Sequence, residues 1–200
     1  MSEWKEYKLS DVADFIDYRG KTPKKTSSGV PLITAKIVKN GWIQKPNEFI
    51  SKDDYLTWMT RGFPKVGDVV LTTEAPLGEV AQIKDASFAL AQRIITIRGK
   101  ANLIENGYLK YFLQSSVGQH RLKERETGTT VTGIKSSELR QVLISAPDFQ
   151  TQTSIAEILS SLDDKIELNN KINQELENLA QSLFKQWFIN FEFPNENGEP

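Results

Sequence analysis

Residues 155–187 read IAEILSSLDDKIELNNKINQELENLAQSLFKQW, and apolar residues recur in this stretch at alternating spacings of four and three. This spacing is typical of a coiled-coil helix, because it keeps the apolar side chains on one side. No Gly or Pro interrupts the chain between Thr151 and Asn190, and Pro147-Asp148 supplies a helix entry. The sequence therefore predicts one long helix over residues 151–190.

Ten positions of this helix form two stripes, of which eight positions are apolar and two are Asn. The stripes are Ile155, Leu162, Asn169, Leu176 and Leu183, and then Leu159, Ile166, Asn173, Ala180 and Trp187. A third stripe of Ile158, Ile172 and Leu179 widens the apolar face. Forty helical residues span about 60 Å. We expect the two stripes, Ala180 aside, to contact a second copy or another chain, with Asn169 and Asn173 fixing the register. The alternative is that the helix folds back onto its own body.

The preceding 150 residues hold short β-branched and apolar runs separated by turn residues. These runs predict strands over residues 30–35, 37–43, 69–73, 80–83, 88–90, 94–97 and 142–145. Short helices are expected, with Ser10 and Ser51 as N-caps of the first two, over residues 11–15, 51–60, 108–114, 118–125 and 136–140. The elements interleave without a regular β-α-β rhythm, so the predicted class is α+β with a mixed or antiparallel sheet. We expect a domain of residues 1–150, the helix of 151–190 and a tail of 191–200.

Composition excludes several classes of site. The chain has no Cys, which removes disulfides and thiolate ligands, and its one histidine, His120, excludes any site that needs two. No apolar run is long enough to cross a bilayer, and the N-terminus lacks the pattern of a signal peptide. We therefore expect a cytoplasmic protein with no membrane partner and no metal.

Charge is unevenly divided along the chain. Residues 1–150 carry 22 Lys and Arg against 17 Asp and Glu, whereas residues 151–200 carry 3 against 9. A basic body joined to an acidic extension favours a polyanion-binding part and a protein-binding part. The alternative is that an excess of five positive charges over 150 residues is ordinary.

Catalytic motifs are missing from the sequence. It contains no phosphate-binding loop of the G-x-x-x-x-G-K-[ST] kind and no G-x-G-x-x-G after an expected strand. Asp163, Asp164 and Lys165 resemble a nuclease cluster, but they fall within the heptad helix and are better interpreted as a solvated face. We therefore expect recognition rather than catalysis.

Three stretches of the chain resemble the specificity subunits of type I restriction-modification systems. The first runs from Gly67-Asp68-Val69-Val70 through Pro76-Leu77-Gly78 to Ala91-Gln92-Arg93, and is similar to the hairpin core of their target recognition domain. The second runs from Thr127-Gly128 to Ile166, and resembles the passage into the family's spacer helix. The third, residues 180–191, resembles the end of that helix. Together with residues 4–20, the resemblance covers nearly the whole chain in the right order.

The resemblance implies a non-catalytic DNA-recognition subunit. Such subunits bind double-stranded DNA through target recognition domains and dock modification subunits, which carry S-adenosylmethionine and methylate adenine; restriction subunits can join to cleave. Family members usually have two recognition domains and two spacer helices, whereas this sequence has one of each. The chain is then either a half-subunit that dimerises or a fragment of a longer protein. An antiparallel homodimer would read an interrupted palindrome, with half-site centres within about 18 base pairs.

Candidate DNA contacts cluster around the basic, turn-rich stretch of residues 17–29. The candidates for phosphate contacts are Arg19, Lys21, Lys24, Lys25, Lys36 and Lys39, with Lys123 and Arg125 as a second cluster. The candidates for base-edge contacts are Thr22, Thr73, Thr129 and Thr130. The competing hypothesis is a protein-assembly module with a coiled-coil stem, and a nuclease is a second rival.

Overall fold

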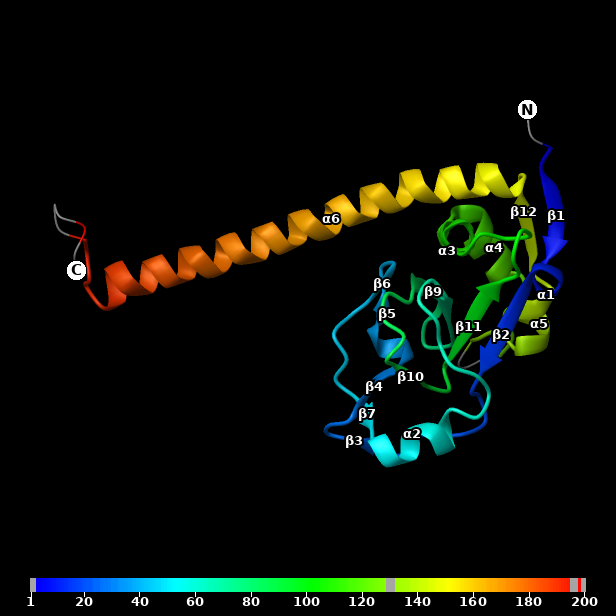
Figure 1. The fold of residues 1–200 in the computed structure, drawn as a ribbon, viewed down its shortest axis with the longest axis horizontal. Coiled ribbons are helices and arrows are strands. Elements are labelled where there is room, and N and C mark those ends of the chain that lie inside the picture. The colour runs from blue at the N-terminus through cyan, green and yellow to red at the C-terminus, as the bar shows by residue number, and fades with distance from the viewer. Residues whose placement is uncertain (1–2, 129–131, 195–197, 199–200) are drawn as a thin grey trace. The chain divides into compact units, whose positions relative to one another are not determined.

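The structure, a computed structural model, describes residues 3–128, 132–194 and 198. It divides into two compact units, Met1–Glu157 and Ile158–Pro200, and the long helix α6 (Phe149–Phe184) contributes to both. The first unit combines short strands and short helices, and the second consists mainly of the rest of α6 (Figure 1). The predicted α+β class with one long C-terminal helix is confirmed.

One sheet of the globular unit is antiparallel and has four strands. Its spatial order is β2 (Ala13–Asp17), β11 (Ile94–Gly99), β8 (Val69–Thr73) and β9 (Leu77–Gln82). Strand β8 is buried at every position, as expected for a central strand made of Val, Leu and Thr. Helix α3 (Asn106–Gln114) packs against β8, β9 and β11, and a hydrophobic core fills the space around it.

A second sheet of four short strands is mixed. Its order is β10 (Ala89–Leu90), β4 (Val30–Ile33), β7 (Phe49–Ile50) and β3 (Lys25–Thr26), with β10 and β4 parallel and the other pairs antiparallel. A second hydrophobic core includes the buried residues of these strands. Helix α2 (Lys52–Trp58) follows β7, and its predicted cap is confirmed because Asp54 N donates to Ser51 Oγ at 3.0 Å.

The remaining elements of this unit are short. Strands β1 (Lys5–Lys8) and β12 (Leu143–Ala146) pair antiparallel, as do β5 (Val38–Lys39) and β6 (Trp42–Ile43). The helices are α1 (Leu9–Val12), the 3₁₀ turn η1 (Ala35–Ile37), α4 (Ser116–Lys123) and α5 (Ser136–Arg140).

The predicted helix over residues 11–15 is wrong. Helix α1 ends at Val12, and Ala13 already begins β2, which pairs with β11 along its whole length. Ser10 lies inside α1 rather than capping it, and its hydroxyl donates to Asp11. Pairing with the buried strand β11 overrides the helical preference of this segment.

The predicted strand over residues 37–43 is also wrong, because the chain turns back in its middle. Val38 pairs with Ile43 and Lys39 with Trp42, which leaves Asn40 and Gly41 as the two turn residues. Both have positive φ, 53° and 89°, as a two-residue hairpin with an Asn-Gly turn requires.

Helix α6 begins at Phe149 and is followed by a π-helical segment, η2 (Lys185–Ile189), close to the predicted extent of 151–190. Its first turns belong to the globular unit. Buried Gln152 accepts from Glu105 N at 2.9 Å and donates to Pro147 O at 2.9 Å. Ile155 packs against the first core, and Ala156 is part of it. The helix entry is therefore anchored by both packing and hydrogen bonds.

Within the described residues, the helices are all too short or too polar to cross a lipid bilayer.

Candidate nucleic-acid interface

Three neighbouring cavities line one region of the globular unit. The Glu48 cavity, of about 220 Å³, and the Arg19 cavity, of about 330 Å³, share Gln92. The Pro76 cavity, of about 300 Å³, shares Ala75 with the Glu48 cavity. The β8–β9 connection, Glu74–Pro76, thus contributes to all three. We call this region the basic face, because six basic and three acidic side chains line it: Arg19, Lys25, Lys36, Arg93, Lys123 and Lys135, with Glu48, Glu74 and Glu126.

The Glu48 cavity gathers cations from three separate parts of the sequence. Lys25 Nζ lies 2.8 Å from Glu48 Oε2, and Lys36 Nζ lies 3.4 Å from Glu48 Oε1. On another part of the lining, Arg93 Nε lies 2.9 Å from Glu74 Oε1, with both side chains substantially exposed. Two predicted phosphate contacts, Lys25 and Lys36, are therefore brought together although they lie eleven residues apart in the chain.

Arg19 in the neighbouring cavity is largely engaged within the protein. Its guanidinium donates to both carboxylate oxygens of Asp17, and Nη1 donates to Ile134 O at 3.0 Å. Burial raises the pKa of Asp17, but the hydrogen bonds and charge of Arg19 outweigh burial and hold this pKa below its ordinary value. Arg19 thus ties β2 to the segment before α5 as well as lining the cavity.

The two residues of the second predicted cluster, Lys123 and Arg125, have different environments. Lys123, at the end of α4, is exposed and lines the Pro76 cavity. Arg125 is half-buried and forms an ion pair with Glu138 at 3.1 Å. Lys123 therefore belongs to the basic face, whereas Arg125 braces α5.

The loop between β2 and β3 carries three further candidates, Lys21, Thr22 and Lys24. All three lie within the four residues before Lys25, and all three are exposed. The loop joins the Arg19 cavity, which Gly20 lines, to the Glu48 cavity, which Lys25 lines. Lys39 is exposed on β5 and lines none of the three cavities. The loop is therefore continuous with the basic face.

The threonine candidates differ in accessibility. Thr73 lines the Arg19 cavity, but it is 2% exposed and its Oγ1 is buried without a hydrogen-bond partner within the described residues. A base edge cannot reach this hydroxyl as it stands, because Thr73 is the last residue of the buried strand β8. Thr129 and Thr130 lie outside the described residues.

Sequence reasoning missed five charged residues of the basic face: Glu48, Glu74, Arg93 as a cavity residue, Glu126 and Lys135. Arg93 stands in the Ala91-Gln92-Arg93 stretch that carried the family resemblance, so a signal for it existed. For Glu48 no local signal exists. Only the pairing of β7 with β3 and β4 brings it beside Lys25.

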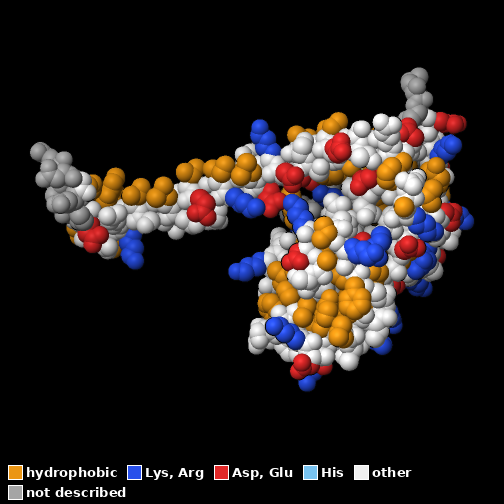
Figure 2. Space-filling view, viewed as in Figure 1, with side chains coloured by type: hydrophobic (Ala, Val, Ile, Leu, Met, Phe, Trp, Pro, Cys, Tyr) orange, Lys and Arg blue, Asp and Glu red, His pale blue; other side chains and the backbone are white. Residues whose placement is uncertain are grey.

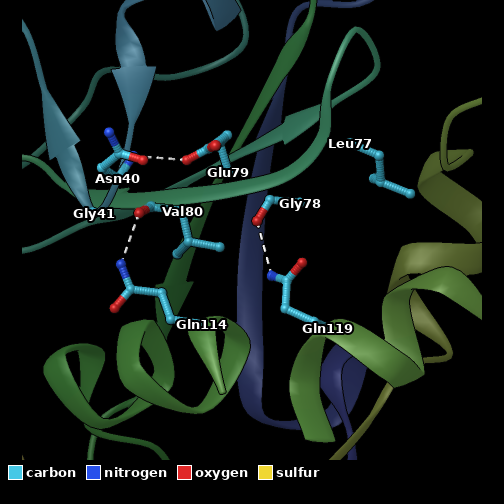
Figure 3. Close-up of a pocket in the computed structure, with 8 residues that line it drawn as sticks. All are labelled: Asn40, Gly41, Leu77, Gly78, Glu79, Val80, Gln114 and Gln119. Carbon is cyan, nitrogen blue, oxygen red and sulfur yellow. Dashed lines mark hydrogen bonds between the residues drawn. The ribbon is translucent and has the colours of Figure 1, made fainter. Parts of the chain in front are cut away.

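A fourth cavity, of about 360 Å³, is lined by polar groups that are already used (Figure 3). Gln114 Nε2 donates to Val80 O at 2.9 Å, and Gln119 Nε2 donates to Gly78 O at 2.8 Å. These bonds tie α3 and α4 to β9, while Asn40 N donates to Glu79 at 2.8 Å and holds the β5–β6 turn. The donors here serve the fold, so we place the candidate interface on the basic face.

The predicted contact face of the long helix is exposed in the second unit. Leu162, Ile166 and Leu176 are 55%, 51% and 58% exposed. Figure 2 shows hydrophobic side chains in a row along one side of this helix. Asn169 and Asn173 are exposed, Leu159 is half-buried, Leu183 is 37% exposed, and Trp187 packs its ring on Phe193. Ile155 differs from these, because it packs against the core of the globular unit.

The fold is that of the S subunits of type I restriction-modification systems. The S subunit from M. genitalium matches with a TM-score of 0.58 and 19% identity, over 93% of this chain and 49% of that one. The likeness therefore extends through both units of the chain, and it concerns the fold.

The chain belongs to the family of type I restriction modification DNA specificity domains, whose model matches residues 1–178. It is 33% identical to the MjaIX specificity subunit of Methanocaldococcus jannaschii, over 97% of this chain and 46% of the relative. It is 30% identical to the HindI specificity subunit of Haemophilus influenzae, over 96% of this chain and 42% of the relative. The chain thus spans less than half the length of these curated relatives.

Proposed function

We propose that this chain is the sequence-specific DNA-recognition subunit of a type I restriction-modification complex. The observation that carries the proposal is the match of residues 1–178 to the specificity-domain family. The basic face supports it, because a concave surface with a positive balance suits the phosphates of a duplex. In this proposal the chain is not an enzyme. It directs adenine methylation by a modification subunit in the cytoplasm, and a restriction subunit would add cleavage.

In this proposal, the chain makes two kinds of contact with the DNA duplex. Lysines of the basic face and of the loop before β3 hold phosphates and set the position of the duplex, whereas polar side chains meet base edges. S-adenosylmethionine would belong to the modification subunit and supply the methyl group there. What this chain supplies is the choice of site.

We further propose that two copies act together. The helix from Phe149 to Ile189 extends about 60 Å, and its apolar side chains from Leu162 to Leu183 are exposed. Antiparallel packing of two such helices about a two-fold axis would cover both faces and present two recognition domains. The site read by such a dimer is an interrupted palindrome.

The proposed DNA contacts are tested by changing Lys21, Lys24 and Lys25 together to Ala. Binding to duplexes of any sequence should weaken, and the slope of log affinity against log salt should fall by about 0.9 for each phosphate that is no longer bound. Fluorescence anisotropy over a series of KCl concentrations measures both quantities.

The matched control changes Lys45, Lys52 and Lys65 to Ala, since these exposed lysines line none of the three cavities and the net charge changes equally. An equal loss of affinity in both variants would mean that the loop acts only through overall charge. Salt-insensitive or absent DNA binding by the unaltered chain would favour the protein-assembly hypothesis.

A further inference from the structure

The Glu48 cavity lies at one edge of the mixed sheet. Strands β4 and β10 are parallel, so the residues that follow them, Thr34–Lys36 and Ala91–Arg93, emerge at the same edge. Strand β7 is antiparallel to β4, so Glu48, the residue before it, reaches this edge as well. The main chain of Glu48 is fixed there, because its carbonyl accepts from Leu32 N at 2.9 Å.

The charges in this cavity are arranged around a single carboxylate. Two lysines approach different oxygens of Glu48, Lys25 at Oε2 and Lys36 at Oε1. The hydrogen bond from Lys25 holds the pKa of Glu48 below its ordinary value, so the carboxylate is charged at neutral pH. The side chain of Glu48 is 19% exposed, whereas that of Lys36 is 74% exposed. Each lysine therefore has a partner in the free protein, yet the pairs remain open to solvent.

One buried hydroxyl of the cavity lining has no hydrogen-bond partner within the described part of the chain. Thr34 is 7% exposed, and its Oγ1 is buried without a hydrogen bond. The half-buried Gln92 lines the same cavity, whereas Gln82, Gln114, Gln119 and Gln152 all donate to backbone carbonyls. Buried polar groups are rarely left unpaired, so the hydroxyl of Thr34 points to a ligand that pairs with it. The Thr34 hydroxyl and the Gln92 amide can both donate to an anion.

We propose that the Glu48 cavity is a binding site for a nucleic-acid phosphate. In the free protein, the carboxylate of Glu48 pairs with the two lysines that bind this phosphate in the complex. On binding, the two lysines exchange the carboxylate for a phosphate oxygen, and Gln92, Arg93 and Thr34 complete the lining. Glu48 thus weakens binding to every sequence alike, which leaves discrimination to base contacts made elsewhere. This inference rests on the proposed DNA-binding function.

The test is Glu48→Gln, which keeps the shape of the side chain and removes its charge. Affinity for an unrelated duplex should rise about tenfold at low salt, because the lysines no longer have to leave a charged partner before they bind the phosphate. The matched control is Asp53→Asn, an exposed acid at the start of α2 that lines none of the cavities and should change affinity little. Unchanged or weaker binding by folded Glu48→Gln would overturn the proposal.

A second variant keeps the proposal testable if Glu48→Gln does not fold. Gln92→Ala should weaken binding about fivefold and equally for duplexes of different sequence, since phosphate contacts carry no sequence information. Gln44→Ala, at an exposed glutamine outside the cavity, is its control. A weakening confined to one sequence would make Gln92 a base contact instead and overturn its assignment to a phosphate.

Inorganic phosphate distinguishes the two sources of the anion. If Glu48→Gln gains thermal stability from inorganic phosphate but no affinity for duplex DNA, the binding site takes a free anion and the nucleic-acid assignment fails. If the unaltered chain binds DNA and Glu48→Gln changes nothing, the proposed function stands and this inference fails. If the unaltered chain and Glu48→Gln both bind no DNA, the proposed function itself fails.

Discussion

Asp68 shows how one turn residue holds two strands in place. It is 1% exposed, and its carboxylate accepts from Arg98 Nε and Nη2, both at 2.7 Å, and from Lys65 N at 2.7 Å. These bonds join the turn before β8 to strand β11. Asp68 directly precedes the predicted strand over residues 69–73, but its partner thirty residues away follows only from the register of the sheet.

Removing Arg98 should therefore leave a buried charge with too few partners. Arg98→Ala is expected to lower the free energy of unfolding by about 3 kcal/mol, as for other broken buried pairs. Urea denaturation followed by circular dichroism measures the change. The double variant Asp68→Ala with Arg98→Ala is the control, and it should recover part of the stability. If the double variant is destabilised by the sum of the two single effects, the pair is not the cause.

The Asp17–Arg19 pair gives the fold a sensitivity to acid. Because the pKa of Asp17 is lowered in the folded protein, its contribution to stability is complete above the unfolded pKa and is lost as pH falls through the folded value. Asp17→Asn should be less stable than the unaltered chain at pH 7, and the difference should shrink below about pH 4. Thermal melts from pH 2 to pH 7 measure this, and a constant difference would exclude the pair as its source.

At the scale of elements, sequence patterns correctly predicted the helices and strands that depend on short-range interactions. The cap of α2 at Ser51, the buried strand β8 and the long helix all follow from short-range patterns, and the structure contains them. The strand β2 and the β5–β6 hairpin depend on pairing partners elsewhere in the chain, so the predicted helix and single strand were wrong. The Asn40-Gly41 pair was nevertheless a readable hairpin signal.

The exposed face of α6 makes a prediction about assembly. Leu162→Glu with Leu176→Glu should convert a dimer into monomers, because each substitution places a charge in the seam that the two apolar stripes form. Multi-angle light scattering measures the mass directly. The control is Gln174→Glu with Ser182→Glu, which adds equal charge to exposed positions outside the three apolar stripes. Seam variants that remain dimeric would show that another surface joins the two copies.

At the scale of the whole molecule, the sequence predicted the type of binding surface better than it predicted which residues form that surface. The basic balance of residues 1–150 pointed to a polyanion-binding part, and the globular unit carries a basic face. Among the predicted contacts, the fold brings together Arg19, Lys25, Lys36 and Lys123 and leaves Lys39 apart. Which charges meet depends on strand order, and strand order depends on contacts between distant residues. No local sequence pattern therefore indicates that an acid such as Glu48 belongs to this surface.

The central claim is that this chain chooses where a partner modification subunit methylates DNA. Its most direct test is methylation-aware sequencing of DNA from cells that express the chain together with a modification subunit of a type I system. We predict adenine methylation at one interrupted palindrome, abolished when the chain is omitted. Methylation that does not depend on the chain, or none at all with both subunits present, would contradict the account.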